Sequence, residues 1–173
     1  MFFTKQLLIV TLLFSCCGAM AQLNELSDKK PVTINGIEYG YMVKNEQTKS
    51  AKGEEYNRFE ITLFATNKSG CTRLFANNTG LLYSENNNLL ATFDCTNANG
   101  KRLTAKSGTV RARDFYVSTK VKPDVKDAKE ITQSVKVGYI FRNGETLRSN
   151  IIVLVPLGEK PAITFSPNTP AEL

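Results

Sequence analysis

Apolar residues recur at every second position along most of the chain, whereas the spacing typical of an amphipathic helix is hard to find. The stretch NRFEITLFATN shows the pattern, because Phe59, Ile61, Leu63 and Ala65 occupy one set of alternate positions. Side chains of a strand point alternately to its two faces, so this spacing predicts strands that bury one face. Since no crossover helices separate these strands, we expect an all-β fold, either an antiparallel sandwich or a barrel.

The sandwich is the preferred architecture, because the predicted strands are short and the core lacks a run of small residues that would line a ligand cavity. We expect an antiparallel immunoglobulin-like β-sandwich of about seven to nine short strands. After removal of the N-terminal segment described below, about 150 residues remain, which is enough for one domain with its own core. That domain is expected over residues 22–156, and residues 157–173 are expected to form a proline-containing tail with at most one short strand, around Ile163 to Phe165.

Two Asn-Gly pairs each lie between alternating runs and predict hairpin turns. Asn35-Gly36 predicts a tight two-residue turn. Asn143-Gly144 predicts a second hairpin, in which a strict two-residue turn would misalign the apolar residues of the two strands. Because burial of matched apolar faces should outweigh ideal turn geometry, we expect Phe141 to lie opposite Leu147, with a longer loop or a bulge at the tip.

The first 21 residues have the organisation of a cleaved secretory signal. Lys5 supplies a positive charge, an almost unbroken apolar run follows, and the small residues that end at Ala21 offer a cleavage site before Gln22. The apolar run is too short to span a bilayer, which takes about 20 residues. We therefore expect a secreted or periplasmic protein. The alternative is acylation of Cys16, which would anchor the chain to a bacterial membrane.

The chain contains no histidine and no tryptophan. The lack of histidine excludes Ser-His-Asp and Cys-His nucleophile systems and every histidine-containing metal site. Outside the signal the only cysteines are Cys71 and Cys95, too few for a four-ligand zinc site, so we expect no metal and no cofactor. In an exported chain this pair predicts a disulfide, with Cys95 facing the core beside Phe93 and the two cysteines on adjacent or facing strands.

Basic residues cluster between positions 101 and 129. Arg111 and Arg113 share one strand face, as do Lys120 and Lys122, and these four residues are the candidate site for an anionic polymer or lipid headgroup. The alternative is a solvated strand face that discourages edge pairing. Because aromatic residues are sparse in this stretch, the combination of stacking and charge that binds single-stranded nucleic acid is weak, and no nucleic-acid partner is expected. The net charge of +6, which falls to +5 without Lys5, is ordinary for solubility.

Two triplets fit the acceptor pattern for N-glycosylation, one beginning at Asn67 and the other at Asn77. They matter only in a host that glycosylates its exported proteins. In a bacterial export pathway, both triplets would indicate turns.

Function is the least constrained property, because no nucleophile has an identifiable activating base. The signal, the short strands and the proline-bearing tail resemble small β-sandwich proteins of the bacterial envelope, without a motif of a particular family. We expect a non-enzymatic protein that binds or supports a protein or glycan of the envelope through an exposed edge strand or loops. The alternatives are a binding module for an anionic polymer and a hydrolase that uses two buried carboxylates.

Overall fold

The computed structural model describes residues 24–51, 53–76, 87–97, 99–104, 107–122 and 129–168. These residues form strands, turns and loops, with no helix among them. The strands are β1 (Asn24–Leu26), β2 (Val32–Ile34), β3 (Ile37–Ala51), β4 (Glu54–Asn67), β5 (Arg73–Ala76), β6 (Leu89–Thr96), β7 (Gly108–Arg111), β8 (Arg113–Val121), β9 (Ile131–Phe141), β10 (Thr146–Pro156) and β11 (Ala162–Pro167). The predicted signal peptide, with Cys16 and the Ala21–Gln22 cleavage site, lies outside the described residues, as does the Asn77 triplet.

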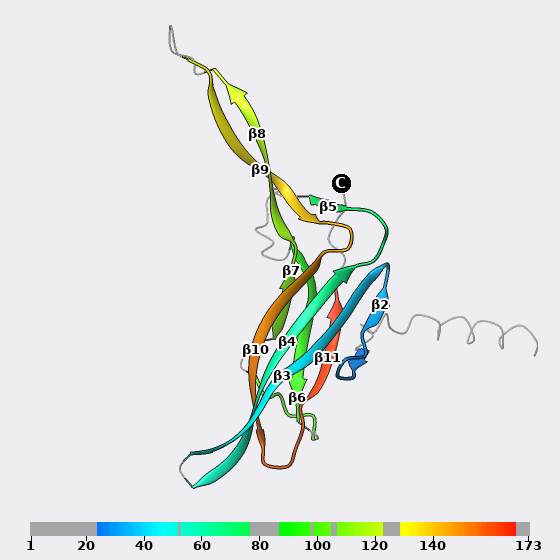
Figure 1. Ribbon diagram of the computed structural model, residues 1–173, viewed down its shortest axis with the longest axis vertical. Coiled ribbons are helices and arrows are strands. Elements are labelled where there is room, and N and C mark those ends of the chain that lie inside the picture. The colour runs from blue at the N-terminus through cyan, green and yellow to red at the C-terminus, as the bar shows by residue number, and fades with distance from the viewer. Residues whose placement is uncertain are drawn as a thin grey trace, which may run out of the picture.

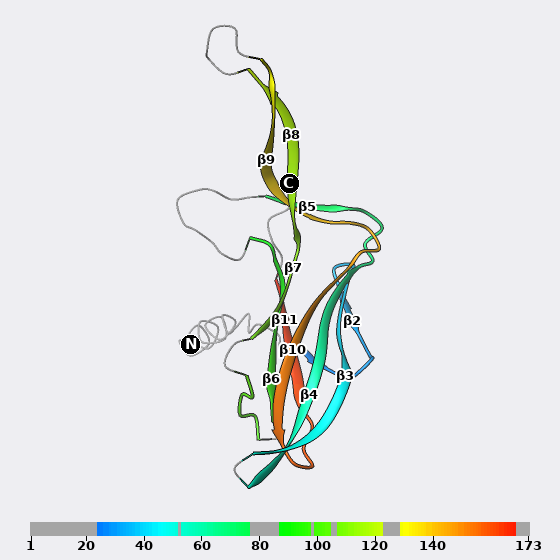
Figure 2. The same cartoon turned by 60° about the vertical axis from the view of Figure 1, so that its left-hand side comes forward.

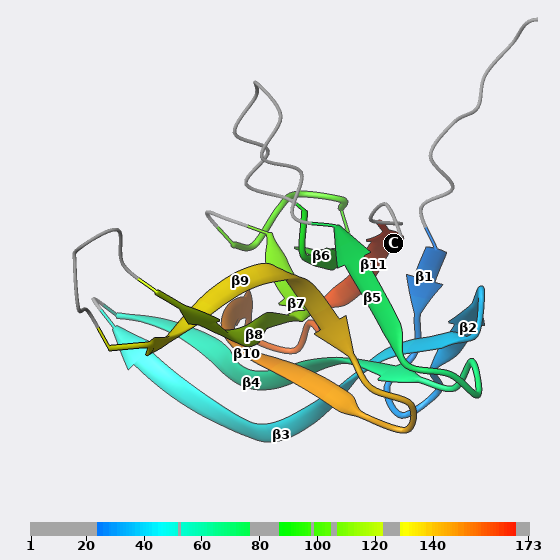
Figure 3. The ribbon, with the colours of Figure 1, turned by 90° about the horizontal axis from the view of Figure 1, so that it is seen from above.

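The strands form three sheets, in which every neighbouring pair is antiparallel (Figure 1). One sheet has the order β1-β11-β6-β7 and a second has the order β10-β4-β3-β2. Seen from above, these two four-stranded sheets lie as two layers facing each other (Figure 3). The third sheet, β5-β9-β8, has only three strands. The predicted all-β, antiparallel class is therefore confirmed.

The core lies between the two four-stranded sheets. On β4 the predicted alternation is confirmed, because Phe59, Ile61, Leu63 and Ala65 are all buried. The facing sheet contributes a group of aromatic and branched side chains together with the Cys95 thiol (Leu90, Phe93, Val110, Ile163, Phe165). Burial of each large apolar side chain contributes roughly 1.5–3 kcal/mol, so this layer supplies most of the driving force for folding.

The Asn35-Gly36 hairpin is confirmed. Ile34 pairs with Ile37, and Val32 pairs with Tyr39, so that only two residues separate β2 from β3. The φ angles of Asn35 and Gly36 are +50° and +75°. Positive φ at both central residues is what a type I′ turn requires, and Asn and Gly are the residues that adopt it at least cost.

The second predicted hairpin is wrong, because β9 and β10 belong to different sheets. The turn at Asn143–Gly144 does form, with the Glu145 N–H donating to the Arg142 carbonyl at 3.0 Å. It directs the chain out of the β5-β9-β8 sheet and into β10, which pairs with β4 along its whole length. Leu147 therefore lies opposite Ala65 rather than Phe141. Matching of apolar faces still decides the pairing, but β4 offers the better match.

The prediction of seven to nine short strands is also wrong, because the described residues contain eleven strands, four of which have 11 to 15 residues. The strands of three or four residues, such as β1 and β2, are too short to show a period. The outer half of β3 is polar throughout and carries no alternation. In addition, β11 lies between β1 and β6 with Ile163 and Phe165 buried, so the packed core extends beyond the predicted domain end at residue 156.

Candidate interaction hairpin

The strands β8 and β9 run away from the two facing sheets as a ribbon, which both side views show (Figures 1 and 2). Near its base the ribbon is three strands wide, because β5 pairs with β9 at Gly138–Phe141. Beyond that point, residues 116–121 pair with residues 131–136 alone, as far as the structure describes the chain. We call β8 and β9 together the β8–β9 hairpin, whose connection at residues 123–128 lies outside the described residues.

One face of the outer, two-stranded part is apolar. Val117 lies opposite Val135, and Val121 lies opposite Ile131. All four side chains are exposed, with Ile131 at 53% and Val117 at 44% of their full accessible surface. The sequence placed Val117 and Val121 on one face, as observed, but no second layer covers that face in the described structure. We call these four residues the apolar face of the hairpin.

The opposite face of the hairpin is polar and is joined across the two strands. Lys136 donates from Nζ to Oδ1 of Asp114 at 2.7 Å, and its ammonium lies 4.3 Å from the centre of the Tyr139 ring. The hydrogen bond to Asp114 raises the pKa of Lys136, because it favours the charged ammonium. These contacts fix the register of the two strands close to the point where the hairpin leaves the rest of the fold.

The base of the hairpin is attached to the sheets through Asn67, the last residue of β4, which is fully buried. Its Nδ2 donates to the carbonyls of Cys71 and Phe141, each at 2.9 Å. Its Oδ1 accepts from the N–H of Ser69 at 3.0 Å and from the Ser69 hydroxyl at 2.6 Å. One side chain thereby joins three segments: β4, the connection to β5, and the end of β9.

The turn at the end of β9 adds a second attachment. The Asn67 N–H donates to the Glu145 carbonyl at 3.0 Å, and the Gly144 N–H donates to the Asn67 carbonyl at 2.8 Å. Glu145 also accepts from Arg113 of β8, with 2.8 Å between Oε1 and Nε. Arg113 therefore fixes the start of β8 against the same turn.

The geometry of Asn67 also bears on its glycosylation triplet. Both amide hydrogens are donated to carbonyls inside the protein, and the side chain has no accessible surface. In the folded chain Asn67 is therefore a structural amide that an enzyme from outside cannot reach.

The four basic residues predicted to bind an anion do not form one patch. Arg111 lies on β7 and donates to Oδ1 of Asn88 at 2.9 Å, whereas Arg113 is paired with Glu145. Lys120 and Lys122 are exposed at the outer end of β8. Arg113 and Lys120 are seven positions apart along an extended strand, which corresponds to roughly 23 Å. A single polyanion site built from all four residues is not supported by this arrangement.

The predicted disulfide is wrong, because Cys71 is an exposed free thiol and Cys95 is a buried free thiol. Cys71 precedes Arg73, which lines a small cavity with Asn168, and Asn168 pairs with Leu90 at the start of β6. Cys95 lies five residues beyond Leu90 on β6, which places it about 17 Å from Leu90 at the rise of an extended strand. A disulfide needs Cα atoms within about 7 Å, so inward orientation of Cys95 did not bring it to Cys71.

Thiol titration should distinguish the two cysteines. Burial raises the pKa of Cys95 to about 11, with the neighbouring Asp94 carboxylate adding to the effect, so little of the reactive thiolate forms at pH 8. In a variant with Cys16 and Cys17 replaced by serine, we expect one thiol to react rapidly with a disulfide reagent in the native protein. The second should react only after denaturation, and Cys71→Ser should remove the rapid phase. Two unreactive thiols that appear only after reduction would contradict the structure.

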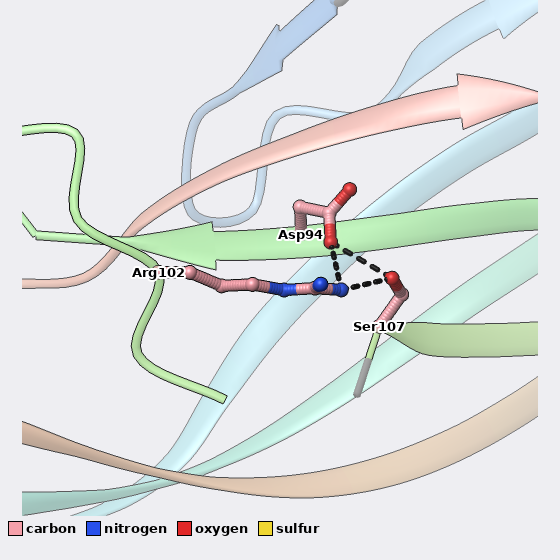
Figure 4. Close-up of polar contacts among 3 residues, drawn as sticks. All are labelled: Asp94, Arg102 and Ser107. Atoms are coloured by element: carbon pink, nitrogen blue, oxygen red, sulfur yellow. Dashed lines mark hydrogen bonds and ion pairs between the residues drawn. The ribbon is translucent and has the colours of Figure 1, made fainter. Parts of the chain in front are cut away.

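Asp94, Arg102 and Ser107 form a polar cluster beside β6 (Figure 4). Asp94 accepts from Arg102 at 2.6 Å and from the Ser107 hydroxyl at 2.8 Å, and Arg102 also donates to Ser107. The Asp94 carboxylate that accepts the Ser107 hydroxyl is also ion-paired with Arg102, so it is already engaged as an acceptor within this cluster. The pair is about half exposed, and exposed ion pairs contribute at most about 1 kcal/mol. These contacts hold Arg102 and Ser107, which follow β6 in the chain, against Asp94 of β6.

The described residues contain no group of three or more Cys, Asp or Glu side chains placed to hold a metal ion. They also contain no helix long and apolar enough to cross a membrane. No protein-family model, no curated protein sequence and no solved structure matches this chain. The β8–β9 hairpin is therefore selected as the candidate site on its geometry alone.

Proposed function

We propose that this chain is an exported, non-enzymatic, immunoglobulin-like β-sandwich protein that binds another macromolecule of the cell envelope through the β8–β9 hairpin. The observation that carries the proposal is the exposed apolar face on a part of the hairpin that is only two strands wide. An isolated two-stranded ribbon is marginally stable in water. A partner that covers Val117 and Ile131 or extends the sheet would remove this weakness.

The other exposed features of the fold support the choice of this hairpin. The outer part of β3 is polar and carries Lys44, Glu46 and Lys49, the kind of charged edge that discourages association. On β10, Ile152 and Leu154 are exposed, but they lie opposite Glu60 and Arg58 on a strand that is fully paired with β4. These apolar residues are interspersed with charges on a supported sheet, where single exposed apolar side chains are common.

The alternative function, binding of an anionic polymer or lipid headgroup, has less support. It was based on four basic residues, and two of them already have polar partners: Arg113 is paired with Glu145, and Arg111 donates to Asn88. Only Lys120 and Lys122 remain together as an exposed pair at the outer end of β8. Two lysines contribute a weak and salt-sensitive attraction, so we place the binding function on the apolar face.

Photo-crosslinking in the producing cells tests this proposal. A photoreactive phenylalanine analogue at Thr119, which lies on the apolar side of β8 opposite Gln133, should give a covalent adduct of higher mass. The same analogue at Thr48 on the polar edge of β3 is the matched control and should give none. Equal adducts at both positions, or none at Thr119, would refute binding through the hairpin.

A further inference from the structure

We propose that the molecule bound by the hairpin is a second copy of this chain, and that the two copies pair antiparallel along β8 about a two-fold axis at Val117. This inference rests on the proposed function of the hairpin as a binding surface. It assigns both the partner and the register, and it makes the pairing a self-complementary strand addition.

The outer edge of β8 is suitable for such pairing. In the order β5-β9-β8, β8 is the last strand, so among the described residues no strand pairs with its outer edge. The extra residue of the bulge near Phe115 is Val137 on β9, which leaves β8 a regular strand. Between Asp114 and Lys120 the five residues FYVST contain no charge, no proline and no glycine. Edges without such protection are the ones that add a further strand.

Charge complementarity selects the register. Antiparallel pairing about Val117 places Asp114 opposite Lys120 of the second copy, and by symmetry Lys120 opposite Asp114 of the second copy. Both residues belong to the polar face of β8, as residues directly opposite each other must. Among the described residues Lys120 has no ion-pair partner within its own chain, so the second copy would supply one.

Neighbouring registers are less favourable. A two-fold axis perpendicular to the sheet keeps the apolar faces of both copies on the same side only when it passes beside a residue of β8. The alternative registers therefore have the axis at a neighbouring residue. An axis at Tyr116 places Asp114 opposite Ser118 and gives neither Asp114 nor Lys120 an opposite charge across the axis. An axis at Ser118 brings Asp114 to Lys122, which lies beyond the end of the strand at Val121. The axis at Val117 is the arrangement that pairs both charges within β8.

Pairing also improves the stability of the hairpin itself. Two hairpins joined along β8 form a sheet four strands wide, and a two-fold axis perpendicular to the sheet keeps the apolar faces of both copies on the same side. Three or more strands with a shared apolar face are what independent stability requires. The two Val117 side chains then lie next to each other at the axis, where each covers part of the other.

Charge exchange tests the register directly. The purified chain should show a concentration-dependent dimer by sedimentation. Asp114→Lys and Lys120→Asp, each alone, should weaken the dimer about tenfold, because each creates two like-charge pairs. Mixing the two variants in equal amounts should restore association, because the mixed dimer regains both opposite-charge pairs. The double variant should regain most of the association lost by the single changes, since it restores both pairs across the axis but not the Asp114–Lys136 contact within each chain.

Matched controls separate this effect from general damage to the hairpin. Lys136→Gln removes the contact of Asp114 within its own chain but no contact across the axis, and Lys49→Asp makes a similar charge change on β3. Both should leave the dimer within about twofold of wild type. In a Cys71→Ser background, Val117→Cys should form an interchain disulfide on oxidation, because directly opposed Cα atoms lie about 4.5–5.5 Å apart. Ser118→Cys should not form this disulfide, because position 118 lies opposite Tyr116 of the second copy rather than opposite itself.

The outcomes distinguish this inference from the proposed function. A monomer at all concentrations, with a crosslinked adduct from Thr119 to a different protein in cells, would overturn the second copy but leave the binding function intact. Binding of anionic phosphatidylglycerol vesicles by a chain that stays monomeric would overturn it in favour of a membrane surface. A monomer without any adduct at Thr119 would remove both proposals. A dimer that is unaffected by the charge variants, or fails to recover on mixing, would overturn the register.

Discussion

Replacing Asn67 by Ala should lower the free energy of unfolding by about 3 kcal/mol, because four hydrogen bonds of one buried side chain are lost at once. The carbonyls of Cys71 and Phe141 lose the Asn67 amide hydrogens, and Ser69 loses the oxygen that accepts its N–H and hydroxyl. Asn67 itself has no accessible surface, and its bond to the Phe141 carbonyl is buried, whereas the bonds to Ser69 and Cys71 are partly buried. The loss should therefore exceed that of an ordinary surface hydrogen bond several-fold.

Urea denaturation of the wild type and Asn67→Ala measures this difference, and Asn143→Ala is the matched control. Asn143 is an exposed asparagine in the adjoining turn, and its replacement should change stability by less than about 0.5 kcal/mol. If the two variants lose the same small amount, Asn67 does not fix the base of the hairpin. Asn67→Ala should also speed hydrogen exchange of the backbone amides in β9 close to Phe141, because the hydrogen bond from Asn67 to the Phe141 carbonyl is lost.

The parts of the fold predicted correctly from sequence are those set by local rules. The alternation in β4 follows from the two-residue period of a strand, and the type I′ turn follows from the positive φ that Asn35 and Gly36 accept. Cys95 was also placed correctly toward the core for the same reason. None of these requires knowledge of which strand lies alongside.

The predictions that failed all depended on partners distant in the chain. Local sequence suggested that β9 pairs with β10, yet β10 pairs with β4, about 90 residues earlier in the chain. The disulfide prediction placed Cys95 on the correct face of β6. It had no information on which part of β6 the segment around Cys71 lies beside. The alternating pattern shows toward which face of the sheet a side chain points. Which residues of other strands lie beside it depends on the pairing register, which the sequence does not reveal.

The candidate site was visible in the sequence only in part. The pattern placed Val117 and Val121 on one face of a strand, which is the apolar face now observed. It could not show that this face has no covering layer in the described structure, because an exposed and a buried alternating strand look alike in sequence. Asn67 was interpreted only as a glycosylation triplet, and nothing in its neighbours marks an asparagine whose side chain joins three segments.

Raising the pH from 9 to 12 should progressively destabilise the protein through two buried acids. Burial raises the pKa of Cys95 from 9.0 to about 11 and that of Tyr39 from 10.0 to about 12. Above pH 9 the unfolded chain releases these protons while the folded chain retains them, so the free energy of unfolding falls as the pH rises. The contribution is fully present below pH 9 and is lost as the pH passes through the folded-state values. Each group should remove roughly 2–3 kcal/mol by the end of its range.

Thermal or urea unfolding at half-unit pH intervals separates the two groups. Cys95→Ala should flatten the fall between pH 9 and 11, and Tyr39→Phe should flatten the fall between pH 10 and 12, each relative to wild type at the same pH. Lysine deprotonation affects all three proteins, so the differences between their slopes isolate the buried acids. Cys95 lies between the facing sheets, and the Tyr39 ring packs at a tilt against the Phe165 ring. Equal slopes in wild type and both variants would therefore mean that water reaches this core, contrary to the packing described above.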